Sequence, residues 1–81
     1  MKPSKMELRI LAVLGNAAID GVAIAERLKA RFGRRRHAGA VYEALTRLHH
    51  RAWVAADDSP RNRRRHYRLE PEGAAYISRF R

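Results

Sequence analysis

The stretch that decides the fold is residues 41–69, VYEALTRLHHRAWVAADDSPRNRRRHYRL. Its first part predicts an amphipathic helix that ends near Arg51, because apolar residues recur there at i, i+3, i+4 and i+7. The segments WVAA (53–56) and HYRL (66–69) have the residue types and alternation of short strands. The polar, turn-rich DDSPRNRRR between them predicts a β-hairpin with a basic tip. The apolar helix positions are Val41, Ala44, Leu45 and Leu48.

Two helices are expected before this stretch. Ser4 followed by Glu7 forms a capping-box pattern, which predicts a first helix over about residues 5–15. After a turn, Asp20 is placed to cap a second helix that ends at Gly33. Apolar side chains recur every four residues in that second helix, as an amphipathic helix requires. They are Ile24, Leu28 and Phe32.

A short last helix is expected to begin at Pro71, since proline is favoured in the first helical turn. The element order is therefore three helices, a two-stranded hairpin and a closing helix, which predicts a mainly α, winged helix-turn-helix fold. We expect one such domain over residues 1–81. In this fold the third helix enters the major groove of DNA, and the hairpin tip contacts phosphates or the minor groove.

The charge of the chain indicates a polyanionic partner. It has 18 Lys and Arg against 8 Asp and Glu, a formal net charge of +10, and 46% hydrophobic residues. A hydrophobic share of that size is enough for a core, so the chain is not a disordered basic tail. Most of the basic residues are arginines, whose planar guanidinium suits phosphate and guanine. Double-stranded DNA is the expected partner.

Several other classes of protein are not indicated. The chain has no cysteine, and the spacing of its four histidines is not that of a metal site, so neither a metal nor a cofactor is expected. No phosphate-binding loop or nucleophile motif is present, so we do not expect an enzyme. Without a signal peptide or an 18-residue apolar run, no membrane association is expected and a cytoplasmic location is predicted.

The segments VYEALTRLHHRAWV (41–54) and RNRRRHYRLEPEG (61–73) resemble the PadR family of bacterial transcriptional regulators. The typical family pattern is LYPAL-RLE-GLI followed by GRRRKYYRLTPEG, and ILAVLGNAAIDGVAIAERL (10–28) is similar to its first two helices. The resemblance implies sequence-specific DNA binding, usually by a homodimer that represses a promoter. It also implies that a small hydrophobic effector releases DNA in some members.

The sequence departs from the family pattern at several positions. A threonine common in the family is replaced by Ala40, and a proline inside its motif by Glu43. The glycine before the first strand is Ala52, where a positive φ is less comfortable for alanine. Trp53 replaces a leucine, and Glu70 replaces the threonine that commonly caps the last helix. The last helix would have about three turns, fewer than in the helix through which such regulators usually dimerise.

The candidate DNA contacts come from the third helix, its N-terminal connector and the wing. A charge run alone is usually a solvated loop, but a run at the tip of a hairpin after a recognition helix favours phosphate contact. Tyr42, an aromatic residue on the third helix, could either contact DNA or pack at the edge of the hydrophobic core. The candidates are Arg34, Arg35, Arg36, His37, Gly39, Ala40, Tyr42, Glu43, Thr46, Arg47, Arg63, Arg64, Arg65 and Arg68.

Two other functions fit the same fold. A winged helix can act as a protein–protein adaptor whose charge gives only non-specific affinity for nucleic acid. RNA binding is a further alternative, although the chain lacks the aromatic stacking motifs of single-strand RNA modules. A preference for one operator over random DNA separates a regulator from an adaptor.

Overall fold

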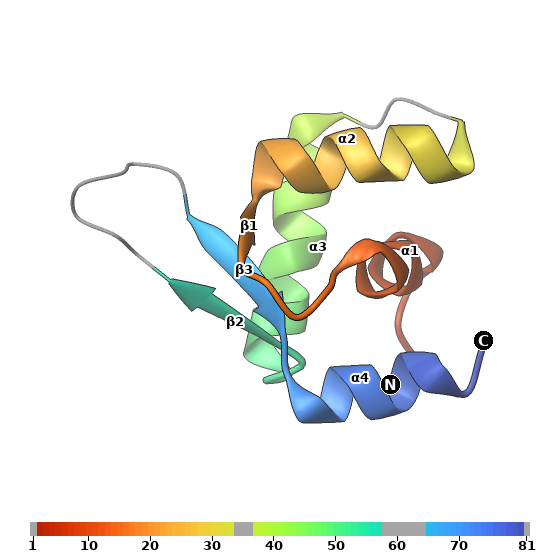
Figure 1. Ribbon diagram of the computed structural model, residues 1–81, viewed down its shortest axis with the longest axis vertical. Coiled ribbons are helices and arrows are strands. Elements are labelled where there is room, and N and C mark those ends of the chain that lie inside the picture. Colours follow the sequence, from red (N-terminus) through yellow and green to blue (C-terminus); the bar gives the residue numbers. More distant parts are fainter. Residues whose placement is uncertain (1, 34–36, 58–64, 81) are drawn as a thin grey trace.

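The computed structural model describes residues 2–33, 37–57 and 65–80, and Figure 1 shows their arrangement. Four helices pack together with a small three-stranded antiparallel sheet at one side of them, which confirms the mainly α winged helix fold. In chain order the elements are α1 (Lys5–Val13), β1 (Ile19–Asp20), α2 (Gly21–Phe32), α3 (Ala38–His50), β2 (Val54–Asp57), β3 (His66–Leu69) and α4 (Pro71–Ser78).

The helix ends follow from local side-chain chemistry. The Glu7 backbone N–H donates to Ser4 Oγ at 3.2 Å, and the Ser4 N–H donates back to Glu7 Oε1 at 3.3 Å, so the expected capping box is formed. Asp20 accepts from the Ala23 N–H at 2.8 Å at the start of α2. Gly33 ends α2 with a φ of 71°, a conformation that glycine adopts without steric cost.

The predicted two-stranded hairpin is confirmed, because β2 and β3 pair antiparallel from Val54 opposite Leu69 to Asp57 opposite His66, and a third strand that the sequence does not predict joins it. The sheet has three strands in the order β1-β3-β2, and β1 pairs with β3 through Ile19 opposite Tyr67 and Asp20 opposite His66. This pairing lies in a stretch that the sequence predicts as a turn. A strand of two residues is too short to show the alternation that identifies strands in a sequence.

Smaller boundary differences have local causes. Helix α1 ends at Val13 rather than near residue 15, because the backbone of Leu14 is extended. Helix α3 ends at His50, with Arg51 as its cap, and β2 begins at Val54, one residue later than expected. Glu70 precedes α4 without a side-chain capping hydrogen bond.

One hydrophobic core joins all the helices to the sheet. Helix α1 packs against α2, α3 and α4, and α3 also packs against α2 and β2, so the apolar stripes of the helices meet in one core. The face of α3 away from this core is therefore open to a partner. The core side chains with at most 1% exposure are Ile10, Leu11, Ile24, Leu28, Val41, Ala44, Leu45, Leu48 and Val54.

Candidate nucleic-acid interface

The outer surface of α3 carries the predicted DNA-reading residues. Five of them, Gly39, Ala40, Tyr42, Glu43 and Thr46, are exposed on α3. Gly39 and Ala40 have almost no side chain, so the first turn of the helix allows the close approach of another molecule. These five positions are therefore accessible to a base edge.

His37 caps the N-terminus of α3. Its Nδ1 accepts a hydrogen bond from the Gly39 N–H at 3.2 Å, and its side chain is exposed. Because Nδ1 accepts, the neutral imidazole carries its hydrogen on Nε2 and can donate it outward. Together with the positive end of the helix dipole, this arrangement suits a phosphate oxygen.

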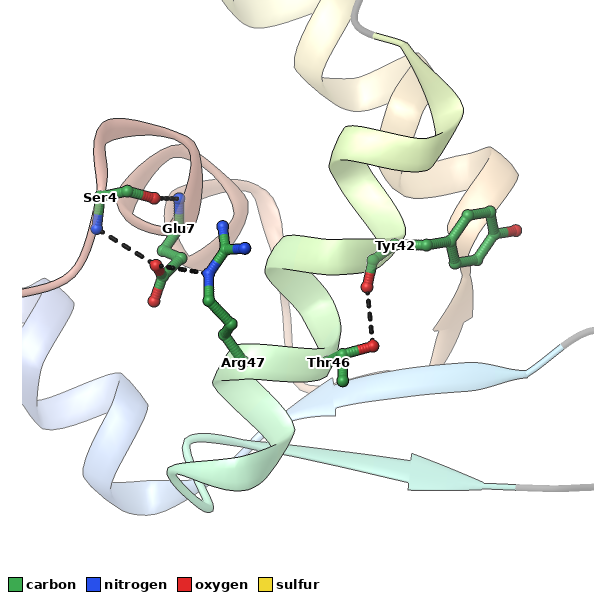
Figure 2. A network of polar contacts seen from close by, with 5 residues as sticks. All are labelled: Ser4, Glu7, Tyr42, Thr46 and Arg47. Carbon is green, nitrogen blue, oxygen red and sulfur yellow. Dashed lines mark hydrogen bonds and ion pairs between the residues drawn. The ribbon is translucent and has the colours of Figure 1, made fainter.

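Tyr42 and Thr46 lie one turn apart on α3. The Thr46 hydroxyl donates to the Tyr42 carbonyl at 2.9 Å, which leaves the lone pairs of the Thr46 oxygen as acceptors (Figure 2). The Tyr42 ring lies against Gly21, where an added Cβ would come within 2.6 Å of the ring. Within the described ranges the Tyr42 hydroxyl makes no hydrogen bond, and 44% of the residue is exposed.

Arg47 points away from Tyr42, toward α1 (Figure 2). Its Nε donates to Glu7 Oε1 at 3.1 Å, and half of the Arg47 side chain is exposed. Burial raises the pKa of the Glu7 carboxyl, but hydrogen bonds from Arg47 and Ser4 and the guanidinium charge outweigh it, so the net pKa is lowered. Arg47 therefore fixes α3 to α1, a role that the sequence does not reveal.

The wing supplies two described arginines. Arg65 directly precedes β3 and is exposed. Arg68 lies on the outer face of β3, with its Nε 3.5 Å from Glu70 Oε1, and over half of its side chain is exposed. The other predicted phosphate contacts, Arg34, Arg35, Arg36, Arg63 and Arg64, lie outside the described residues.

A groove of about 680 Å³ lies between α2 and the first turns of α3. Its lining includes His37 and Tyr42, together with Val22 and Lys29 from α2, which are not among the candidates predicted from the sequence. The sequence could have indicated Val22, because this apolar residue lies outside the four-residue apolar repeat of α2 and is therefore expected on the surface rather than in the core.

Neither a metal site nor a membrane-crossing helix is found in the part of the chain that the structure describes. Residues 2–33, 37–57 and 65–80 contain no group of three or more metal-ligating side chains. No helix in these ranges is long and apolar enough to cross a membrane. The ring of His49 is instead in contact with the backbone, with Nδ1 3.3 Å from the Val54 carbonyl oxygen.

Comparison with known proteins gives consistent matches. Residues 10–79 match the transcriptional regulator PadR-like family. The chain is similar to RosR of H. salinarum, with 27% identity and a TM-score of 0.84 over 95% of this chain and 69% of that one. It is similar in fold to a PadR family transcription regulator of Clostridium difficile R20291, with 22% identity and a TM-score of 0.79 over 95% and 83%.

The same fold is found in a DNA complex. Bacillus subtilis PadR in complex with operator DNA has a TM-score of 0.81 and 15% identity to this chain. The match covers 98% of this chain and 48% of that protein, so this chain spans about half of its length. No curated protein matches the sequence.

Proposed function

The chain belongs to the PadR-like family of transcriptional regulators, and on this premise we propose that it binds one operator sequence in duplex DNA and represses the gene beside it. Members of this family are transcription regulators rather than enzymes. The observation that carries the proposal is the exposed surface of α3, whose inner face is fully buried while its outer residues are open. Because DNA is the partner, the protein would act in the cytoplasm, with residues 1–81 as one DNA-binding domain.

The proposed contacts divide into two kinds. Base edges would be read by the exposed side chains of α3, and phosphates would be held by arginines of the connector and the wing. The base-reading group is Gly39, Ala40, Tyr42, Glu43 and Thr46, and the phosphate group is Arg34, Arg35, Arg36, His37, Arg47, Arg63, Arg64, Arg65 and Arg68. Arg47 is shared between DNA and Glu7 in this assignment.

A homodimer is part of the proposal. An aromatic surface runs along α4, where the Trp53 and Tyr76 rings are 4.6 Å apart and the Tyr76 and Phe80 rings 5.4 Å apart. Phe80 is 61% exposed and adjoins the Tyr76 and Trp53 rings, and an exposed patch of adjoining apolar side chains is typical of an interaction surface. A second copy of the chain is the partner we propose, and a small hydrophobic effector that binds this dimer is proposed from the family resemblance.

Selection of bound sequences from a random duplex library tests the regulator proposal. We expect one consensus, preferred by at least ~10³ over random DNA in competition at fixed salt. A palindromic consensus would match the two-fold symmetry of a dimer. Equal affinity for all duplexes would contradict the proposal and favour the adaptor alternative.

Sedimentation tests the dimer. Phe80→Glu should convert a concentration-dependent dimer into a monomer whose fold is kept, because Phe80 is 61% exposed and its ring contact within the chain is with Tyr76. A wild-type protein that stays monomeric at high concentration would contradict this part of the proposal.

A further inference from the structure

Two exposed apolar side chains face the same groove between α2 and α3. Large hydrophobic residues that are exposed in the described ranges are Val22, Tyr42 and Phe80. Val22 is 50% exposed and Tyr42 44% exposed, and both line the groove of about 680 Å³. The fold itself therefore leaves about half of each side chain in water, although burial of such groups is what stabilises a protein.

The two side chains are held in fixed positions. The Tyr42 ring packs on Gly21, whose missing Cβ is what allows the contact, and Val22 is the next residue in the chain. Asp20 caps this end of α2 through its bond to the Ala23 N–H at 2.8 Å. Because Val22 and Tyr42 lie on two capped helices, their positions are already fixed. A ligand that binds them therefore loses little affinity to the ordering of these side chains.

The surroundings of the pair identify what could cover it. Lys29, His37 and Glu26 line the same groove, so beside one carboxylate it offers a lysine ammonium and an imidazole as hydrogen-bond donors suited to a nucleic acid. Gly39 and Ala40, in the adjoining first turn of α3, are small, so no large side chain blocks access to the groove from that turn. In the major groove of DNA the apolar group that a base edge presents is the C5-methyl of thymine.

We propose that Val22 and Tyr42 form a thymine-reading site, in which the thymine C5-methyl enters the α2–α3 groove and contacts both side chains. The site rests on the proposed operator binding and adds to it one defined base preference. It also assigns a specificity role to α2, in addition to the recognition helix.

Replacement of single thymines by deoxyuridine tests this site, because the exchange removes the methyl group and nothing else. In the selected operator, each thymine is replaced in turn and the affinity of the protein is measured at fixed salt. We expect a loss of about fourfold at one position in each half-site, the value of one buried methyl group. At that position 5-methylcytosine should bind more tightly than cytosine.

Variants of the pair give the matched comparison. Val22→Ala should bind the thymine and deoxyuridine operators equally at the sensitive position, whereas Val22→Ile should keep the discrimination. Tyr42→Phe should also keep it, since the ring rather than the hydroxyl makes the contact, and Tyr42→Ser should lose it. Thermal melting of each variant checks that the fold is intact, which we expect because both side chains are exposed.

The outcomes separate this inference from the function on which it rests. A selected operator that tolerates every deoxyuridine, or a Val22→Ala variant that discriminates as the wild type does, overturns the thymine site and leaves operator binding standing. A protein that prefers no duplex overturns the proposed function, and the site with it. A groove covered by a protein partner would likewise show no dependence on the methyl group.

Discussion

Ala52 holds a backbone conformation that disfavours alanine. Its φ is 62°, and among the described residues other than glycine it is the one with a positive φ. The Ala52 N–H donates to the His49 carbonyl at 3.0 Å and the Trp53 N–H to the Leu48 carbonyl at 3.1 Å, which is the Schellman ending of a helix. Glycine is the residue preferred there, and Ala52 is one of the positions at which the sequence departs from the family pattern.

Ala52→Gly should therefore stabilise the protein. Relief of the left-handed strain is worth about 1–2 kcal/mol, and the added flexibility of glycine returns about 0.5–1 kcal/mol of that. We expect a net gain of about 1 kcal/mol, measured by urea unfolding. Ala75→Gly, at an exposed position within α4, is the matched control and should lower stability by about 0.5–1 kcal/mol. A loss of stability in both variants would contradict the argument.

The Glu7–Arg47 pair predicts a specific dependence of stability on pH. Because the pKa of Glu7 is lowered by folding, its carboxylate stabilises the folded state above the ordinary pKa of 4.5. That contribution is lost as the pH falls below 4.5 and through the lower pKa of the folded state. Urea unfolding between neutral and acidic pH should show a steeper acid loss for the wild type than for Glu7→Gln.

Arg47→Ala gives the complementary measurement. It removes a hydrogen bond and the partner charge, so it should also reduce the acid-dependent loss and should lower neutral stability by about 1 kcal/mol. Parallel pH profiles in the wild type and both variants would contradict this account. If Arg47 also binds a phosphate, the same variant should make the salt slope of DNA binding shallower by about 0.9.

At the scale of elements, the sequence predicts what local chemistry determines. The Ser4–Glu7 capping box, the Asp20 cap and the Gly33 stop each depend on residues within one or two turns, and all three are found in the structure. The apolar repeat of α3 likewise predicts its buried face, because a helix places every third or fourth residue on one side.

Contacts between distant segments were not predictable in the same way. Strand β1 exists because Ile19 meets Tyr67, 48 positions apart in the chain, and nothing in its own two residues indicates this pairing. The Arg47–Glu7 bond joins residues 40 positions apart. With 3.6 residues per turn, Tyr42 and Arg47 lie roughly 140° apart around α3, so a helix projection separates them but does not identify Glu7 as the partner.

The close approach of α4 to Trp53, in the connection between α3 and β2, predicts a strong effect at Gly73. A Cβ at this position would lie 2.5 Å from the Trp53 carbonyl oxygen, which already accepts from the Glu70 N–H at 2.9 Å. Since a backbone atom cannot move aside as a side chain can, Gly73→Ala should destabilise the fold by about 1–3 kcal/mol.

Gly15→Ala is the control for that change. A Cβ at Gly15 would meet nothing within 4 Å, so the substitution should be neutral or should stabilise by up to about 1 kcal/mol through the unfolded state. Thermal melting of the two variants side by side measures the difference. Equal melting temperatures would show that α4 does not depend on this close approach.

At the scale of the molecule, three described arginines on α1 and α2 have surroundings that differ from those of the wing residue Arg65. On one side, Arg27 Nη1 donates to the Val13 carbonyl at 3.0 Å, and the guanidiniums of Arg9 and Arg31 lie over the Phe32 ring at 5.2 and 5.6 Å. Arg9 and Arg27 join α1 to α2 through these contacts, and Arg31 does so through its Nη1, which donates to the Ala12 carbonyl at 3.5 Å. Figure 1 shows α1 on the opposite side of the molecule from the C-terminal end of β2 and the N-terminal end of β3, which the exposed Arg65 directly precedes.

Position, rather than total charge, should therefore decide the salt dependence of DNA binding. Replacement of Arg63, Arg64 and Arg65 by alanine should make the slope of log affinity against log salt shallower by up to about 2.7, or about 0.9 for each phosphate that is no longer neutralised. Replacement of Arg9, Arg27 and Arg31 removes the same charge and should leave the slope nearly unchanged, although it should lower stability. Fluorescence anisotropy with the selected operator across a salt series measures both slopes. Equal changes in the two triple variants would mean that the net charge of +10 acts as a diffuse field, and the wing assignment would be wrong.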